Sequence, residues 1–223
     1  MSILVSIALF PPIDYMALLL FHPEVRIEAH ENYGKQSFRN RYQIIGPNGL
    51  QALSVPVDKR GQARCPIREA AIVSGHWPMV HLRSLDAAYN SSPWYLYFRP
   101  EMEGFLLNRS GMLWDFNLQS IALCAVMLGE EKWQPRLSAS WEKSATGMTD
   151  YREAFHPKRV HPSLTDAALP EQYRQVFGHK WGFIPGMSVL DLIFNEGPAA
   201  RGYLAKRYGQ LLPNLEQNAS PAF

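Results

Sequence analysis

The sequence predicts an α/β protein of one domain, with a mixed sheet flanked by helices and a loop-rich insertion around residues 133–168. Three observations support this class. Apolar runs of strand length alternate with turn signals in the first third of the chain, and helical spacing of apolar residues begins near residue 78. Apolar residues make up 47% of the 223 residues, which is enough for one packed core. We expect the domain to span residues 1–210, followed by a polar tail at 211–223.

The first two elements are expected to be a buried strand and a helix. Residues 3–10 form an apolar run that ends at Pro11-Pro12, and residues 14–21 suit a short helix. The segment has no cationic leader, and prolines and Asp14 interrupt it. It therefore lacks the pattern of an export signal or a membrane span.

The next elements are expected to be strands. Residues 25–29, 37–45, 51–57 and 67–73 are the candidates. Gly46-Pro47-Asn48-Gly49 is a strong turn signal between the second and third of them, which predicts a hairpin.

Helices are expected to follow at residues 78–89, 100–108 and 115–128, with Asp115 as the N-cap of the third. A strand is expected at 136–140 within the loop-rich insertion. Ser188 and Asp191 fit a capping pattern at the start of a short helix, which Gly197-Pro198 closes. A last helix is expected at 199–208.

Charge and cysteine content narrow the function classes. The chain has 22 basic and 20 acidic residues, which gives no support to nucleic-acid binding. Cys65 and Cys124 are too few for a disulfide framework and lack metal-ligand spacing. We therefore expect a cytoplasmic protein without a metal site, and its oligomeric state stays open.

Polar residues between two predicted strands form the first candidate site. Residues 31–41 include Lys35, Arg39, Asn40 and Arg41, and period two would place both arginines on one strand face. A lysine with an arginine suits a carboxylate or a phosphate. The alternative is a strand with a solvated, charged face.

Two further groups contain histidine. His81 lies in the first turn of a predicted helix, where it could be a base or simply a hydrogen-bonded residue. Acid, base and imidazole also gather in the insertion; the residues are Asp150, Arg152, His156 and Lys158. The alternative for the second group is a surface ion pair of little energetic value.

The last candidates lie near the C-terminal end. If residues 173–177 form a strand, Tyr173 and Gln175 share a face and could line a pocket, or they could belong to an ordinary strand. Capping explains Ser188 and Asp191, but it does not explain Asn195 one turn later.

Several short blocks carry a family resemblance through their order along the chain. They are Phe10-Pro11-Pro12-Ile13-Asp14-Tyr15, Glu31-Asn32-Tyr33, Arg39-Asn40-Arg41, Ser54-Val55-Pro56-Val57, Asp150-Tyr151-Arg152, His156-Pro157-Lys158, Tyr173-Arg174-Gln175-Val176-Phe177 and Phe183-Ile184-Pro185 through Asn195. Over roughly residues 3–200 the sequence resembles the WbqC-like proteins of bacteria, most closely the branch common in Bacteroidetes.

This resemblance implies a place in O-antigen or other surface-polysaccharide biosynthesis, because such proteins occur in the corresponding gene clusters. Some are described as candidate glycyl or acyl transferases, and no cofactor carries over. The implied substrate is a small molecule, either a sugar or an acyl donor. The alternative is a non-catalytic protein that binds a nucleotide sugar or serves as a scaffold.

The transferase hypothesis assigns roles to the candidates. His81 or His156 would act as base, and Asp150 would be a further catalytic residue. Substrate-binding roles would fall to Lys35, Asn40, Arg41, Arg152, Lys158, Tyr173, Gln175 and Asn195.

Overall fold

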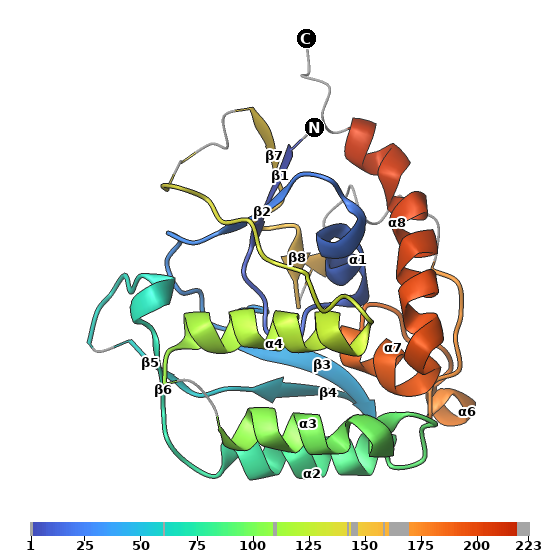
Figure 1. Cartoon of the computed structure of the whole chain (residues 1–223). Coiled ribbons are helices and arrows are strands. Elements are labelled where there is room, and N and C mark those ends of the chain that lie inside the picture. The colour runs from blue at the N-terminus through green and yellow to red at the C-terminus, as the bar shows by residue number, and fades with distance from the viewer. Residues whose placement is uncertain are drawn as a thin grey trace.

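A small parallel sheet organises the fold (Figure 1). The computed structural model describes residues 2–59, 61–108, 111–141, 143, 147–157, 159–160 and 170–217. The sheet contains β1 (Ser2–Ser6), β2 (Val25–Glu28) and β7 (Met148–Asp150) in the order β2-β1-β7, and both pairings are parallel. The first strand therefore lies in the centre of the sheet.

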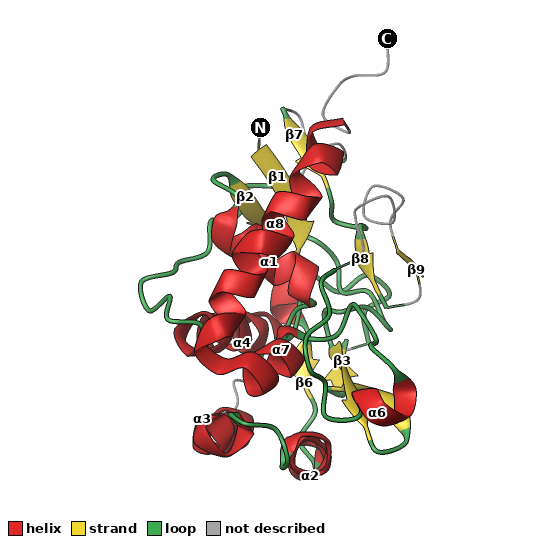
Figure 2. Ribbon diagram, turned by 90° about the vertical axis from the view of Figure 1, so that its right-hand side faces the viewer, coloured by secondary structure: helices red, strands yellow, loops and turns green. Residues whose placement is uncertain are grey.

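The connection from β1 to β2 passes through α1 (Ile13–Phe21). The prolines at positions 11 and 12 end the strand segment, and α1 begins directly after them, where a missing backbone N–H costs no helical hydrogen bond. α1 packs against α8 (Ala200–Gln217), beside the sheet (Figures 1 and 2).

A hairpin forms a separate second sheet. It pairs β3 (Arg41–Gly46) with β4 (Gly49–Ser54), and Gly49 has a φ of 95°, which favours glycine at the turn. α2 (Trp77–Tyr89) and α3 (Tyr95–Leu107) pack together, and α2 contacts β3. Both views show these two helices at the end of the molecule opposite β1 (Figures 1 and 2).

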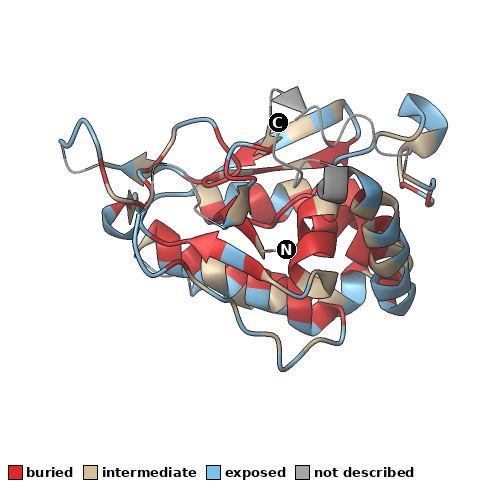
Figure 3. Cartoon of the chain, turned by 90° about the horizontal axis from the view of Figure 1, so that it is seen from above, coloured by how far each residue is buried: buried red, intermediate tan, exposed pale blue. Residues whose placement is uncertain are grey.

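α4 and α7 lie between these two parts. α4 (Leu113–Met127) contacts α7 (Val189–Glu196), and α7 also contacts α1, α3 and β3. The apolar residues of these elements form one core, and buried segments occupy the middle of the molecule in Figure 3. The smaller elements are β5 (Val57–Asp58), β6 (Ala71–Ile72), β8 (Phe155–His156), β9 (Arg159–Val160), α6 (Gly178–Trp181) and 3-10 helices at Ile67–Glu69 and Gly197–Ala199.

The predicted class is confirmed, because the chain forms a single α/β domain whose sheet is flanked by helices. The expected hairpin and helices are present, although parallel and antiparallel pairs belong to separate sheets. Some expected strands differ. Residues 37–40 form turns, and 173–177 contain no strand. Residues 136–140 form no strand and meet β2 at the bridge between Ile27 and Leu137. The segment 67–73 begins with a 3-10 helix and contains only the two-residue strand β6.

Helix ends also differ from expectation. α4 starts before Asp115, which lies in its first turn while Met112 is the N-cap residue. α8 continues through Gly209 and Pro213 to Gln217, because packing of its apolar face against α1 outweighs the low helix propensity of those residues. Within the described residues, no helix is both long and apolar enough to cross a membrane.

Candidate functional site

The carboxyl ends of the three parallel strands place polar side chains at one edge of the sheet. β1 ends at Ser6, β2 at Glu28 and β7 at Asp150. The chain leaves β1 toward β2 on one side, whereas β7 pairs with β1 on the other side. This arrangement is a topological switch point, and ligands of open α/β sheets bind outside the carboxyl ends of strands at such points.

A cavity opens at this edge. Its volume is about 550 Å³, which falls within the range of small-molecule sites. The lining residues are Glu31, Asn32, Arg39, Trp141, Lys143, Asp150, Arg152, Glu153 and Ala154. They include three carboxyl groups and three cationic groups, so the lining suits a polar ligand without a large net charge.

Buried hydrogen bonds hold Ser6, Glu31 and Arg39 together. The Ser6 hydroxyl donates to Glu31 Oε2 over 2.6 Å, and Arg39 Nη2 donates to both Ser6 Oγ and Glu31 Oε2 over 2.6 and 2.5 Å. The backbone N–H of Ile7 donates to the other Glu31 oxygen over 3.3 Å. Burial raises the pKa of the Glu31 carboxyl, and its contact with Arg39 opposes that rise. A carboxyl of this kind beside a cavity is a candidate acid or base.

Arg152 forms the second buried cationic group of the site. Its guanidinium donates to both Asp150 oxygens and to Glu28 Oε2. Burial disfavours the ionised Asp150 carboxylate, but the hydrogen bonds from Arg152 outweigh that effect and lower its pKa. The Arg152 guanidinium carbon lies over the ring of Trp141, 4.5 Å from the ring centroid. Trp141 itself remains 51% exposed. An aromatic face is therefore open to a ligand beside fixed charges.

Arg39 and Arg152 also line a second, smaller space. This space holds about 10 Å³ and borders Ser6, Tyr15 and Tyr151. Arg39 Nε is buried and has no hydrogen-bond acceptor among the described residues. Such an unsatisfied buried donor is costly unless a ligand or a water molecule fills the position.

The structure brings two of the sequence-predicted residues directly to the large cavity, namely Asp150 and Arg152. Lys35 is exposed on the segment that leads to Arg39. Asn40 is buried and donates to the Val55 carbonyl, and Arg41 begins β3. Neither Asn40 nor Arg41 lines the two spaces described above.

The predicted histidines lie away from the large cavity. His81 is buried on α2, 3.3 Å from the Tyr42 hydroxyl and 3.3 Å from the Ser54 carbonyl oxygen. His156 is on β8 and is not a lining residue, although its neighbour Phe155 borders the small space. Lys158 lies outside the described residues.

Tyr173, Gln175 and Asn195 converge on Asp191 in a separate buried network. The hydroxyls of Tyr89 and Tyr173 and the amide of Gln175 donate to the Asp191 carboxylate over 2.8, 2.5 and 2.9 Å. Asn195 donates to the Asp191 backbone carbonyl. This network joins α2, α7 and the 173–184 segment, and it borders neither of the two spaces at the sheet edge.

Sequence reasoning gave no role to several residues of the site, among them Ser6, Glu31, Trp141, Lys143 and Glu153, and it named Arg39 only as part of the polar segment 31–41. Ser6 sat within an apolar run and Trp141 within a polar, irregular stretch, so neither stood out. Glu31 and Arg39 stood in the noted polar segment, but a strand pattern could not show that a turn at 37–40 directs Arg39 inward. The buried Glu–Arg pair is visible only once the strands are placed.

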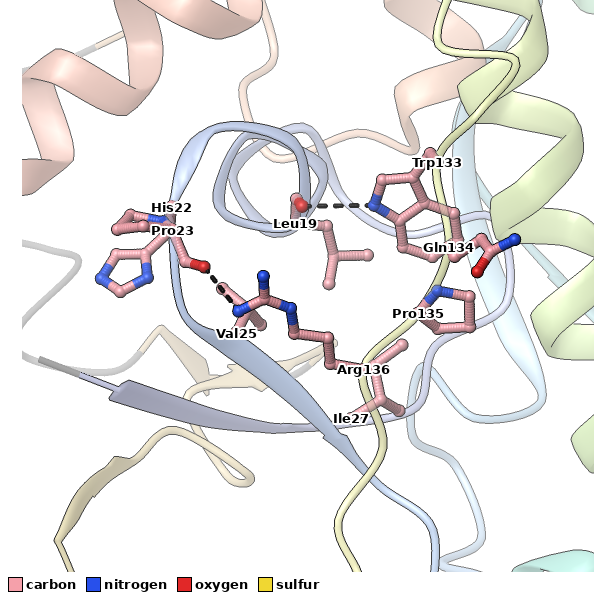
Figure 4. Close-up of a pocket in the computed structure, with 9 residues that line it drawn as sticks. All are labelled: Leu19, His22, Pro23, Val25, Ile27, Trp133, Gln134, Pro135 and Arg136. Atoms are coloured by element: carbon pink, nitrogen blue, oxygen red, sulfur yellow. Dashed lines mark hydrogen bonds between the residues drawn. The ribbon is translucent and has the colours of Figure 1, made fainter.

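Another cavity, of about 170 Å³, lies near the amino end of β2 (Figure 4). Its walls come from α1, the segment that follows it, β2 and residues 133–136, and they include both apolar and polar groups. Trp133 donates to the Leu19 carbonyl, and Arg136 donates to the Pro23 carbonyl and to Glu24. These polar groups are already engaged with the protein, so this cavity is the weaker candidate for chemistry. Among the described residues, no group of three or more His, Cys, Asp or Glu side chains is arranged to hold a metal ion.

Comparisons with known proteins give the family of the chain. The model of the WbqC-like protein family matches residues 8–148. An uncharacterised protein of Mycobacterium tuberculosis is 26% identical over 215 residues, covering 85% of this chain and 91% of that protein. No solved structure matches the chain. Since the family model covers more than half of its length, this chain belongs to the WbqC-like protein family.

Proposed function

We propose that this protein is a transferase of bacterial surface-glycan biosynthesis that binds a sugar in the 550 Å³ cavity and attaches an acyl or aminoacyl group to it. The observation that carries the proposal is the meeting of carboxyl, guanidinium and indole groups at the switch point of the parallel sheet. The surface-glycan context is what the resemblance to WbqC-like proteins implies, and the family model matches residues 8–148.

The lining chemistry supports a sugar as ligand. Sugar rings carry many hydroxyl groups, which need both donors and acceptors, and Asp150, Glu153 and Lys143 provide them at the rim. The exposed face of Trp141 provides an apolar surface for the C–H face of a ring. The balanced charges favour a neutral or zwitterionic ligand over a polyanion.

Glu31 is the proposed base. It lines the cavity, and burial raises the pKa of its carboxyl, which makes the carboxylate a stronger base. The Ile7 N–H and Arg39 fix its orientation, so its carboxylate is held in place before a substrate arrives.

Calorimetric titration of the full chain with neutral sugars and free amino sugars tests binding, and nucleotide sugars serve as the anionic comparison. We expect Trp141→Ala to weaken binding roughly tenfold, equivalent to about 1.4 kcal/mol. Trp181→Ala is the matched control, because Trp181 is 42% exposed on α6 and does not line the cavity. Equal losses in both variants, or no binding by the wild-type protein, would contradict the proposed site.

Glycan composition in the host bacterium tests catalysis. We expect Glu31→Gln to remove one acyl or aminoacyl substituent from the surface glycan, while Asp86→Asn leaves it unchanged. Asp86 on α2 is a matched carboxyl control, since it binds Arg99 on α3 and does not line the cavity.

A non-catalytic sugar-binding protein is the second candidate. Arg39 is paired with Glu31 and Arg152 with Asp150, and such fixed ion pairs can bind a ligand without any reactive group. Retained sugar binding together with an unchanged glycan in the Glu31→Gln strain would favour this second function.

A further inference from the structure

Ser6 occupies an unusual position for a serine at the end of a buried strand. It is the last residue of β1, the central strand, and its side chain borders the small space between Arg39 and Arg152. Its hydroxyl lies 2.6 Å from a carboxylate oxygen, and a guanidinium nitrogen lies 2.6 Å from the same hydroxyl oxygen. These distances match those of a nucleophile paired with its base.

We propose that Ser6 is a nucleophile that carries the acyl group during the transfer, an inference that rests on the proposed function. Glu31 takes the hydroxyl proton, and the Ile7 N–H holds the opposite oxygen of that carboxylate. Arg39 offers positive charge where the attacking oxygen becomes negative. The three residues thus supply nucleophile, base and electrostatic stabilisation.

The reaction balances in two steps with an activated donor of the thioester class. In the first step the Ser6 oxygen bonds to the acyl carbon, the carbon–sulfur bond breaks, and the Ser6 proton passes through Glu31 to the departing sulfur. In the second step an amine or hydroxyl of the sugar bonds to the acyl carbon and gives its proton to Glu31. The Ser6 oxygen leaves and takes that proton, which restores the starting state.

Access to Ser6 depends on the two arginines. Arg39 and Arg152 line both the large cavity and the small space, so the two side chains form the wall that separates these spaces. One guanidinium has to rotate before an acyl carbonyl can enter. We infer that the Arg39 guanidinium pivots while its Nη2 keeps the hydrogen bonds to Ser6 and Glu31, because its Nε has no acceptor among the described residues and its outer partner Glu153 is 3.8 Å away and 66% exposed.

Ser138 is an internal comparison within the same chain. Its hydroxyl also donates to a buried carboxylate, Glu28 Oε1, over 2.7 Å, and it has the same 9% exposure as Ser6. Ser138 also accepts the backbone N–H of Ala29 and borders neither of the two spaces at the sheet edge. A buried serine thus pairs with a carboxylate at both Ser6 and Ser138, and of these two pairs the Ser6 pair lies on the site.

Reaction of the full chain with diisopropyl fluorophosphate tests the inference. The hydroxyl oxygen bonds to phosphorus, the phosphorus–fluorine bond breaks, and the proton leaves with fluoride. We expect intact mass and peptide mapping to show one adduct, on Ser6, with none on Ser138. Glu31→Gln should slow labelling about 100-fold. Asp86→Asn should leave the rate unchanged.

An unlabelled wild-type protein, equal labelling of Ser6 and Ser138, or an undiminished rate in Glu31→Gln would overturn the inference. Because the peptide mapping is done on the wild-type protein, the outcome does not depend on whether a Ser6 variant folds. Sugar binding is measured by calorimetry on the same samples. A protein that binds sugar but gives no Ser6 adduct would refute the nucleophile role and leave the proposed sugar site intact. A protein that gives a Ser6 adduct but binds no sugar would refute the proposed sugar site.

Discussion

At the scale of single residues, two buried titratable groups lie outside the candidate site and hold the fold together. The Asp191 carboxylate accepts hydrogen bonds from Tyr89, Tyr173 and Gln175. His81 lies on α2 beside Tyr42 and the Ser54 carbonyl. Both were singled out from sequence, and the structure explains both by burial and hydrogen bonding.

Replacement of Asp191 should cost stability in proportion to the acceptors removed. Asp191→Ala leaves three buried donors without their acceptor, so we expect the free energy of unfolding to fall by about 3 kcal/mol. Asp191→Asn keeps one carbonyl oxygen and should cost less. Urea denaturation of both variants measures the difference, and equal losses would show that the hydrogen bonds are not the cause.

Acid should destabilise the protein through His81. Burial lowers the pKa of His81 to about 4, from an ordinary value of 6.5. The unfolded chain therefore binds more protons between these two pH values, and stability is lost as pH falls through that window. We expect a loss of about 3 kcal/mol that is absent from His81→Gln, measured by urea denaturation from pH 7 to pH 4. Identical pH slopes for the two proteins would contradict this account of His81.

At the scale of secondary-structure elements, α7 shows what a local sequence pattern can predict and what it cannot. Ser188 caps the helix by accepting the Leu190 N–H, as the capping pattern predicted, and Gly197 follows its last residue. Asp191 was also attributed to capping, but its carboxylate instead joins the tyrosine network. Spacing along the chain could predict the cap, but it could not predict partners contributed by α2 and by residue 173.

The end of α7 gives a test with a matched control. Gly197 has a φ of 53°, and a Cβ there would lie 2.4 Å from the Trp94 ring. We expect Gly197→Ala to lower the free energy of unfolding by about 3 kcal/mol through strain and displacement of that ring. Gly202 lies in α8, and a Cβ added there has no atom within 4 Å. Gly202→Ala should therefore raise the free energy of unfolding by about 0.5–1 kcal/mol. Similar effects of both substitutions on thermal unfolding would contradict the close approach of Trp94.

At the scale of the whole molecule, sequence patterns predicted the class better than the site. Apolar runs and turn residues indicated β1, α1, β2 and the β3–β4 hairpin, because their partners are close in sequence. The pairing of β1 with β7 joins residues almost 150 positions apart, and it brings Asp150 and Arg152 to the cavity that Glu31 also lines. No local pattern encodes that pairing, so the residues of the site could be noticed singly but not assembled.

The central claim is that the carboxyl ends of β1, β2 and β7 form the ligand site. The most direct test is to map backbone amide shifts by NMR while titrating the sugar that binds most tightly in calorimetry. We predict that the perturbed amides cluster at residues 6–8, 28–32 and 150–154. A cluster at residues 19–27 and 133–136, around the cavity of Figure 4, would contradict the claim.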